Sequence, residues 1–349
     1  MKILVTGGTG FIGKKVVRLL EPEVEKIFLL VRKRSLEKAK KAFPNSKKIQ
    51  IIEGDILSND VCSHVEDVNL LSESVSHVLH LAAYYDLAMN VLDAYTHNVI
   101  GVQNVLNLSR KLKSLVYFHH ISTYAVNGSC GGRIQEQDFF IDTPFPDHYS
   151  KSKMQGEHLV RTMQIGDVKK RIYRPGIVVG DSQTGEIEKI DGPYYFLKFM
   201  HEIDNYHHWI EKLGFLPLPF GPKTIFPIVP VDILAEWISE SVLRPTPEKE
   251  LKTYHFIGKN QISLKNFIEQ CLAEIGINCS VVRVKRNNLY KHLFPKMGMP
   301  KELMPYMFME ASFDTSERRK DFPNHREYLI EEMISRLVKG GKIHFREGS

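Results

Sequence analysis

The chain has 349 residues, of which 43% are hydrophobic and 25% charged, values typical of a soluble globular protein with one large domain or two fused ones. Its four cysteines show neither CxxC pairing nor metal-ligand spacing, so we expect a reducing compartment, no disulfide scaffold and no bound metal. The formal net charge of +6 fits either a solvated basic surface or attraction to phosphate-bearing ligands, whereas no zinc spacing, RNA-binding signature or long basic run indicates nucleic acid as a partner.

No charged-then-apolar leader precedes the first apolar run, and no run approaches the length needed to cross a bilayer. We therefore expect a cytoplasmic protein without a transmembrane segment.

Apolar runs rich in Ile, Leu and Val alternate with amphipathic stretches through the first half of the chain. We expect buried strands at Ile3–Val5, Ile27–Val31, Ile49–Ile52, Val78–Leu81, Leu115–Phe118 and Val168–Tyr173. We expect helices at Phe11–Leu20 and Val99–Leu112, and another that carries Tyr149 and Lys153. This alternation predicts an α/β fold with a doubly wound parallel sheet covered by helices on both faces.

The strand–helix rhythm ends near Gly180, where aromatic residues and prolines become frequent. We expect a cofactor-binding domain at residues 1–180 and a smaller substrate-binding region at residues 181–349, interleaved with the last strands of the sheet. Within the second region Val231–Leu243 is a clear helix, and Phe215–Pro222 is either a substrate lid or a rigid connector. The methionine-rich stretch Met297–Met309 fits core packing, a mobile wall around an acyl chain, or a surface that touches a membrane.

A glycine turn follows the first expected strand directly. Glycine is needed there for the tight turn, for close approach of the backbone to a pyrophosphate, and for packing of helix against strand. The helix that begins near Phe11 would aim its free N–H groups and its positive dipole end at the phosphates. The sequence therefore predicts a dinucleotide site that includes Gly7, Thr9, Gly10, Phe11, Ile12 and Gly13.

The end of the second strand carries Arg32 and Arg34 and no acidic residue. An acidic residue at this point would bind the ribose hydroxyls of NAD, whereas cations suit the 2′-phosphate of NADP. The alternative is that these arginines are surface charges that open a helix. Further cofactor contacts are expected after the third and fourth strands, at Asp55, Ile56, Leu81, Ala82 and Ala83.

Tyr149 and Lys153 are four residues apart, so on a helix they project from the same face. A free tyrosine has a pKa of about 10, and a neighbouring ammonium lowers that pKa toward the working range of an acid–base group. The preceding strand, which we extend to Ile121, ends in Ser122 and Thr123, and either hydroxyl could hold a substrate carbonyl oxygen beside the tyrosine.

Three other residues in or near this strand could suggest a catalytic or metal-binding role, but packing explains them more simply. His119 and His120 point to opposite faces and are expected to pack or to form hydrogen bonds rather than share a ligand. Cys130 is expected to be a small buried thiol rather than a nucleophile, because no general base is positioned beside it by the sequence.

The order of these motifs resembles that of the extended short-chain dehydrogenases/reductases, which have a Rossmann-type fold, over roughly residues 1–260. The matching motifs are TGGTGFIG, HLAA, Asn98–Asn104, His120–Thr123, YSKSK and Arg174–Val178. The resemblance implies that Tyr149 is the proton donor and that Lys153 tunes it and binds the nicotinamide ribose. It implies that Thr123 is the hydroxyl partner, with Ser122 as the alternative, and that Asn98 is a helix-bending residue linked to the proton relay. The expected contacts of the nicotinamide carboxamide are Pro175, Gly176, Ile177 and Val178.

A narrower resemblance, to fatty acyl-CoA reductases and thioester reductase domains, comes from Arg174–Glu186 and Asp191–Tyr195. It implies an NADPH-dependent reductase of a carbonyl or thioester on an apolar acyl group. A homodimer is a further expectation from resemblance, and peripheral membrane contact is a further expectation from the methionine-rich stretch. Two alternatives stay open: a sterol, flavonoid-type or nucleotide-sugar dehydrogenase or epimerase of the same fold, and a non-catalytic NADP-binding sensor.

Overall fold

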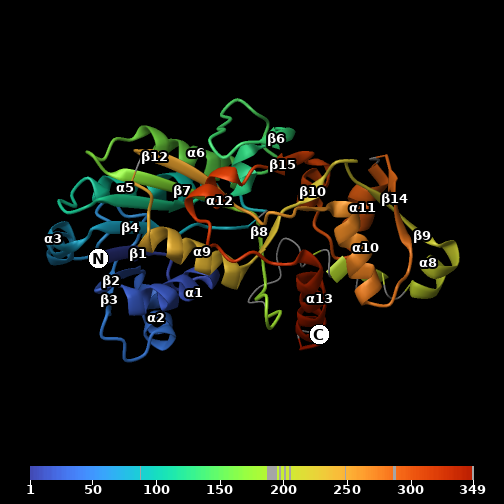
Figure 1. Ribbon diagram of the computed structural model, residues 1–349, viewed down its shortest axis with the longest axis horizontal. Helices are drawn as coiled ribbons and strands as arrows, with labels where there is room; N and C mark the ends of the chain where they lie inside the picture. The colour runs from blue at the N-terminus through green and yellow to red at the C-terminus, as the bar shows by residue number, and fades with distance from the viewer. Residues whose placement is uncertain are drawn as a thin grey trace.

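The computed structural model describes residues 1–86, 88–186, 195, 198–199, 202–203, 206–247, 249–285 and 288–347. A seven-stranded sheet lies at its centre, with the strand order β12-β7-β5-β4-β1-β2-β3 and every pair parallel (Figure 1). The strands are β1 (Lys2–Thr6), β2 (Lys26–Val31), β3 (Ile49–Glu53), β4 (His77–His80), β5 (Tyr117–Ile121), β7 (Lys169–Pro175) and β12 (Leu251–Phe256). The α/β class and the doubly wound parallel sheet predicted from the sequence are confirmed.

Helices cover both faces of the sheet because successive residues of a strand point in opposite directions, and strands such as β1 and β2 are apolar on both sides. Ile3 and Val5 pack in the core under α1 and α9, whereas Leu4 packs in the core on the other face. The helices on the first face are α1 (Phe11–Leu20), α2 (Leu36–Ala42) and α9 (Val231–Leu243), and those on the second are α3 (Val65–Ser74), α5 (Gly101–Ser109) and α6 (His148–Thr162) (Figure 1). Short 3-10 turns lie at Glu21–Glu23, Lys33–Ser35 and Tyr124–Asn127 (η4).

The helix expected at Val99–Leu112 begins eight residues earlier and contains a π-helical turn. It runs as α4 (Val91–Tyr95), η3 (Thr96–Ile100) and α5. A π turn inserts one extra residue into the helix, so the apolar stripe before it is out of phase with the stripe after it. The sequence period therefore revealed only the second part of this helix.

Strand β12 was not expected, because Lys252 and His255 interrupt its apolar pattern. Both side chains are buried and each has a distant partner: Lys252 binds Asp321, and His255 Nδ1 lies 2.7 Å from the carbonyl oxygen of Asp314. Buried polar groups are tolerated when they are paired in this way. Residues beyond position 180 thus contribute β12 and α9 to the central sheet layers. The division into two regions at residue 180 stays a prediction.

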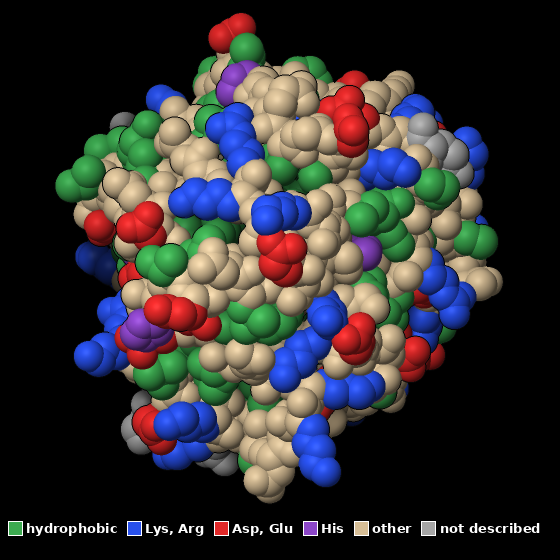
Figure 2. All heavy atoms as spheres, turned by 90° about the vertical axis from the view of Figure 1, so that its left-hand side faces the viewer, with side chains coloured by type: hydrophobic (Ala, Val, Ile, Leu, Met, Phe, Trp, Pro, Cys, Tyr) green, Lys and Arg blue, Asp and Glu red, His purple; other side chains and the backbone are tan. Residues whose placement is uncertain are grey.

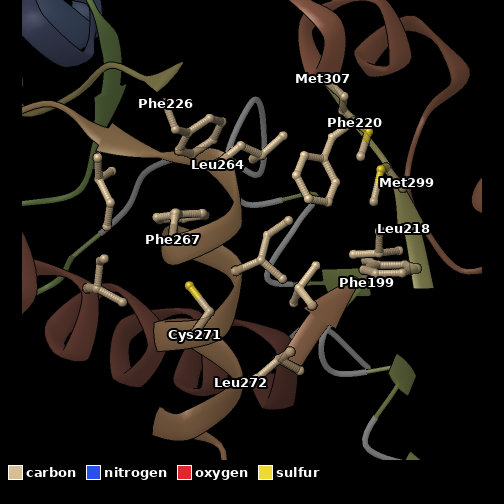
Figure 3. Close-up of a cluster of buried hydrophobic side chains, with 14 of the residues drawn as sticks. Phe199, Leu218, Phe220, Phe226, Leu264, Phe267, Cys271, Leu272, Met299 and Met307 are labelled. Atoms are coloured by element: carbon tan, nitrogen blue, oxygen red, sulfur yellow. The ribbon is translucent and has the colours of Figure 1, made fainter. Parts of the chain in front are cut away.

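A second core gathers the C-terminal elements at the right-hand end of Figure 1. Figure 3 shows Phe226, Leu264, Phe267 and Met299 in this core, which is separate from the cores of the sheet. Its elements and their neighbours are β6 (Gly132–Ile134), β8 (Ile177–Val179), α8 (His207–Leu213), β9 (Phe215–Pro219), β10 (Ile225–Phe226), β11 (Ile228–Pro230), β13 (Ile262–Ser263), α10 (Leu264–Glu274), β14 (Ser280–Val284), α11 (Asn288–Lys296), η5 (Lys301–Phe308), β15 (Ala311–Phe313), α12 (Ser316–Asp321) and α13 (Ile330–Glu347).

Two segments left open by the sequence have a packing role. In the methionine-rich stretch, Met299, Met304 and Met307 are buried in the second core. Residues 215–219 form strand β9, which pairs with β14, and Phe220 is buried in the same core. The methionine-rich stretch therefore packs in the second core, with Met307 also bordering the cavity described below, and residues 215–219 are a paired strand. No helix among the residues in the described ranges is long and apolar enough to cross a membrane.

Candidate functional site

A cavity of about 780 Å³ lies along the carboxyl ends of the parallel strands. This is the edge at which open α/β sheets bind ligands, because the strand order reverses there and the loops diverge. The cavity is lined by every residue that the sequence predicted as a cofactor contact, and by Thr123, Tyr149 and Lys153. Asn98 is the one expected site residue that lies behind the wall rather than in it.

The glycine turn forms the floor of the cavity between β1 and α1. Gly7 has a φ of +75°, and a Cβ atom on it would lie 2.6 Å from the backbone nitrogen of Ala82. A Cβ atom on Gly13 would collide with the carbonyl oxygen of Gly7. No side chain caps α1 after Gly10, and its first turn holds no acidic residue, so its N–H groups are available to an anion. The turn therefore fits a pyrophosphate.

Cations line the cavity at the carboxyl end of β2. Arg32 and Arg34 border it, together with Ser35 and Lys38, which the sequence analysis did not single out. Lys33, between the two arginines, does not border it. The signal for Lys38 was the helical spacing of four residues from Arg34. This end of the cavity thus presents three cationic side chains.

Tyr149 and Lys153 lie on α6 and face the cavity. Lys153 is buried, and its Nζ donates a 2.7 Å hydrogen bond to the carbonyl oxygen of Ile121. Burial lowers the pKa of Lys153 to about 8, against the opposing influence of Glu157. The ring of Tyr149 meets that of Tyr85 edge to face, with centroids 4.8 Å apart. The pair therefore shares the helical face that the spacing predicted.

Ser122 and Thr123 differ in what their hydroxyls bind. The Ser122 hydroxyl donates a 2.6 Å hydrogen bond to the buried carboxylate of Glu157. The Thr123 Oγ1 accepts a 3.3 Å hydrogen bond from the backbone N–H of Ala125, which leaves its own proton to be donated elsewhere. Of the two, the Thr123 hydroxyl is the one able to donate to a ligand without giving up a buried partner.

Asn98 lies in the π turn and joins three segments. Its Oδ1 accepts from the backbone N–H of Tyr84 at 2.9 Å, and its Nδ2 donates to the carbonyl oxygen of Tyr84 and to Ser152 Oγ, both at 3.0 Å. Ser152 immediately precedes Lys153 on α6. Asn98 thus holds the loop after β4 and the helix of Tyr149 in fixed positions, and π turns are frequent at functional sites.

Glu157, which the sequence analysis did not identify, binds the residues that support the site. Its carboxylate is fully buried and accepts two hydrogen bonds from Arg174, at 2.7 and 3.1 Å, besides that of Ser122. Arg161 donates two more, at 2.7 and 2.9 Å. Burial would raise the pKa of Glu157, but the two guanidiniums lower it to about 2. The only local signal was its place one helical turn after Lys153.

The far wall of the cavity comes from segments that are distant in the sequence. Tyr306 borders the cavity and donates a hydrogen bond to Asp147, the residue that caps α6. Tyr84 and Tyr85 directly follow the expected Leu81–Ala83 contacts, and His97 lies beside Tyr84. The apolar part of this wall is formed by Phe226, Leu264, Leu303 and Met307.

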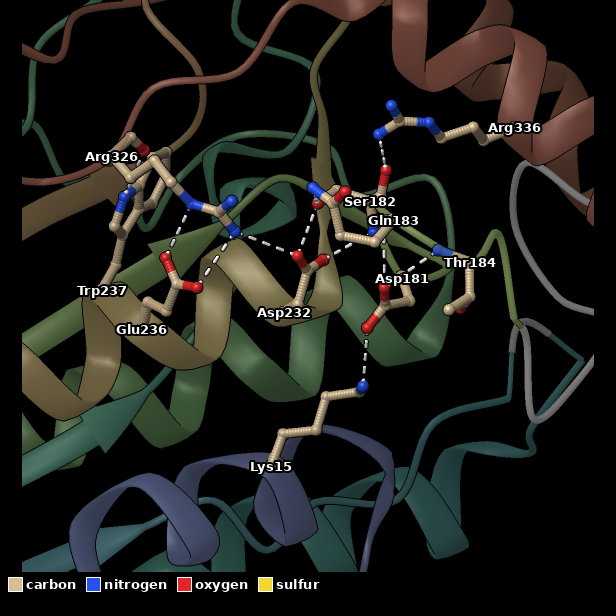
Figure 4. Close-up of polar contacts among 10 residues, drawn as sticks. All are labelled: Lys15, Asp181, Ser182, Gln183, Thr184, Asp232, Glu236, Trp237, Arg326 and Arg336. Carbon is tan, nitrogen blue, oxygen red and sulfur yellow. Dashed lines mark hydrogen bonds and ion pairs between the residues drawn. The ribbon is translucent and has the colours of Figure 1, made fainter.

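The second half of the Arg174–Glu186 motif builds a turn that ties α1 to the C-terminal region (Figure 4). Asp181 accepts from Lys15 Nζ at 2.8 Å, and Ser182 donates to Asp232 on α9. Arg336 on α13 donates to the carbonyl oxygen of Ser182. This turn therefore connects α1, the helix that follows the glycine turn, to the second core. The Asp191–Tyr194 part of the second motif lies outside the described residues.

The remaining candidates have packing or hydrogen-bonding roles. His119 Nδ1 lies 2.8 Å from the hydroxyl of Tyr173, whereas His120 stacks on His80 on the other face of the sheet. Cys130 packs against a small core beside η4 and does not border the cavity. Among the described residues, no group of three or more His, Cys, Asp or Glu side chains is arranged to hold a metal ion.

The parallel sheet order and the glycine turn after β1 define a Rossmann-type α/β fold. More narrowly, the chain belongs to the family described as male sterility protein, whose model matches residues 5–238.

Two relatives are fatty acyl-CoA reductases. The alcohol-forming fatty acyl-CoA reductase of Simmondsia chinensis is 30% identical over 169 residues, which are 40% of this chain and 34% of that protein. Fatty acyl-CoA reductase 2 of Mus musculus is 28% identical over 240 residues, which are 55% of this chain and 46% of that protein. The match thus spans between a third and a half of the length of these relatives.

Solved structures share the fold at low sequence identity. The terminal R domain from the myxalamid PKS-NRPS biosynthetic pathway superposes with a TM-score of 0.78 at 20% identity, covering 99% of this chain and 91% of that one. The Bordetella bronchiseptica enzyme WbmG, in complex with NAD and UDP, superposes with a TM-score of 0.64 at 17% identity, covering 98% and 94%.

Proposed function

We propose that the protein is an NADPH-dependent reductase of an acyl thioester, or of the aldehyde derived from it. The observation that carries this proposal is one continuous cavity, which is lined by the glycine turn, by Tyr149, Lys153 and Thr123, and by the apolar residues Phe226, Leu264, Leu303 and Met307. Relatives named fatty acyl-CoA reductases and a neighbour that is the R domain of a biosynthetic assembly line support the same substrate class.

The bound cofactor supplies a hydride to the carbonyl carbon. Tyr149 and Thr123 would donate hydrogen bonds to the carbonyl oxygen, and Tyr149 would transfer its proton to that oxygen as negative charge develops on it. The ammonium of Lys153, fixed by Ile121, would stabilise the phenolate that remains. From a thioester, the resulting hemithioacetal would release a thiol and leave the aldehyde.

A substrate panel tests the substrate class. We expect NADPH oxidation with medium- and long-chain acyl-CoAs or the corresponding fatty aldehydes, and none with UDP-sugars, because part of the cavity wall is apolar. Loss of NADPH is followed by absorbance, and the products by mass spectrometry. Turnover of a UDP-sugar without acyl reduction would contradict the proposal and favour an epimerase or dehydratase.

The choice of NADPH over NADH is proposed from the cations at the carboxyl end of β2. Replacing both Arg32 and Arg34 with serine should weaken NADPH binding on the order of 100-fold, because two charge-assisted hydrogen bonds to the 2′-phosphate are lost. Binding of NADH, which has no such phosphate, should change little. Both affinities are measured by fluorescence titration.

Lys33→Ser is the matched control, since it removes a cation from the same turn but outside the cavity. If Lys33→Ser and the double variant lose the same NADPH affinity, the loss comes from general surface charge and not from contacts of Arg32 and Arg34 with the 2′-phosphate. A wild-type preference for NADH would contradict the cofactor assignment. The homodimer and the cytoplasmic location expected from the sequence stay predictions.

A further inference from the structure

The end of the molecule farthest from β3 carries an apolar ridge on its surface, formed by Tyr206, Trp209, Leu213, Phe215 and Val282. Tyr206 directly precedes helix α8, and positions 206, 209 and 213 are three and four residues apart, so they lie on one side of the helix. These three side chains are 58%, 65% and 61% exposed, whereas the neighbouring Ile210 is buried in the second core. A helix that covers a core normally turns polar side chains to water.

Strands β9 and β14 continue the ridge. Phe215 opens β9 directly after the left-handed Gly214 that ends α8. Val282 lies opposite Pro217 in the parallel pair of β9 with β14, and both Phe215 and Val282 are exposed. In Figure 1, α8 and β9 lie at the extreme right of the long axis, so both elements stand at one end of the molecule.

Basic side chains accompany the ridge. Lys212 Nζ lies 5.9 Å from the centroid of the Trp209 ring, and Arg283 and Lys285 are exposed on and just after β14. The one carboxylate of α8, Glu211, forms an ion pair with His207. By contrast, Figure 2 shows basic and acidic side chains interspersed over the opposite end of the molecule. The apolar ridge thus has a cationic border suited to an anionic surface.

We propose that this ridge docks on the surface of an anionic lipid bilayer, with the rings of Trp209 and Tyr206 at headgroup depth. Tryptophan and tyrosine concentrate at that depth because their rings combine an apolar body with a polar atom. Lysines near an anionic leaflet add attraction, whereas lysine is depleted from protein–protein interfaces. The exposed rings of Trp209 and Tyr206 and the two lysines therefore favour a lipid surface over a protein partner. This inference does not depend on the proposed catalytic activity.

The tryptophan content of the chain provides a direct measurement. The chain has two tryptophans, and the other, Trp237, is buried and donates a hydrogen bond to the carbonyl oxygen of Arg326. With the 349-residue chain, vesicles of phosphatidylcholine and phosphatidylserine should shift the emission of Trp209 to shorter wavelength, and co-sedimentation should show binding. Pure phosphatidylcholine vesicles should bind more weakly.

Leu213→Glu should weaken binding to the mixed vesicles about ten-fold or more, because it places a carboxylate in the apolar ridge. Lys285→Ser should weaken it about five-fold, and only when phosphatidylserine is present. Val65→Glu is the matched control: Val65 is 72% exposed on α3, at the opposite end of the molecule, and its replacement should leave binding unchanged.

Three results would overturn the proposal. In the first, the wild-type protein stays in the supernatant with both vesicle types. In the second, Leu213→Glu binds as well as Val65→Glu. In the third, binding is equally strong with and without phosphatidylserine. A concentration-dependent dimer that Leu213→Glu dissolves, without vesicle binding by the wild type, would assign the ridge to a second copy of the chain instead.

Discussion

Replacing Tyr149 with phenylalanine is expected to lower kcat for acyl reduction by about 10²- to 10⁴-fold, the usual contribution of a positioned general acid. The aromatic ring, its edge contact with Tyr85 and the fold of α6 would all remain. The dissociation constant of NADPH should therefore change little, since only the hydroxyl is removed. Steady-state rates and fluorescence titrations with NADPH separate the two quantities.

Tyr95→Phe is a control with the same chemical change. Tyr95 is an exposed residue of α4 and does not border the cavity. The kcat of Tyr95→Phe should therefore match that of the wild type. Turnover that survives in Tyr149→Phe would mean that another group, or water, protonates the substrate oxygen. The assignment of Tyr149 as proton donor would then be wrong, although the dinucleotide site would be unaffected.

The parts of the site that the sequence revealed are those encoded by short spacings. The glycine turn is a run of residues whose backbone must approach Ala82 and the helix start closely, and glycine alone permits this. The Tyr149–Lys153 pair needs only one helical turn. Arg32 and Arg34 stand where a parallel strand ends, and that edge of the sheet is where such folds bind ligands. Local geometry is sufficient in each case.

The parts that the sequence left hidden depend on partners far apart in the chain. Tyr306 reaches the cavity through its hydrogen bond to Asp147, 159 residues earlier. Strand β12 has a mixed polar pattern that makes sense only once Lys252 meets Asp321. No periodicity or spacing reports such contacts, because they arise when separate elements pack. The same applies to the choice between Ser122 and Thr123, which depends on the buried carboxylate of Glu157.

Replacing Glu157 with glutamine should lower the free energy of unfolding by about 3–5 kcal/mol, because it leaves buried guanidinium charge without a counter-charge. Arg174 is fully buried, and Arg161 donates to the same carboxylate oxygen. Urea unfolding at neutral pH measures the change as a shift of the transition midpoint at constant slope.

The pH dependence gives an independent check on this carboxylate. Because the pKa of Glu157 is lowered in the folded protein to about 2, its stabilisation is complete above the ordinary carboxyl pKa and is lost as the pH falls toward 2. Glutamine does not titrate. The stability difference between wild type and Glu157→Gln should therefore be constant from pH 6 to 7 and shrink as the solution becomes more acidic than about pH 4.5.

Glu236→Gln is the control that separates burial from pairing. Its carboxylate binds Arg326 with the same two-pronged geometry, at 2.9 and 3.0 Å, but both side chains are partly exposed on the surface (Figure 4). Water screens such a pair, so the control should cost about 0–1 kcal/mol. If both variants lose the same small amount, the Glu157 network does not stabilise the junction of β5, β7 and α6. If Glu157→Gln alone is strongly destabilised, the Glu157 carboxylate, which accepts the hydrogen bond of the Ser122 hydroxyl, also holds these three elements together around the cavity.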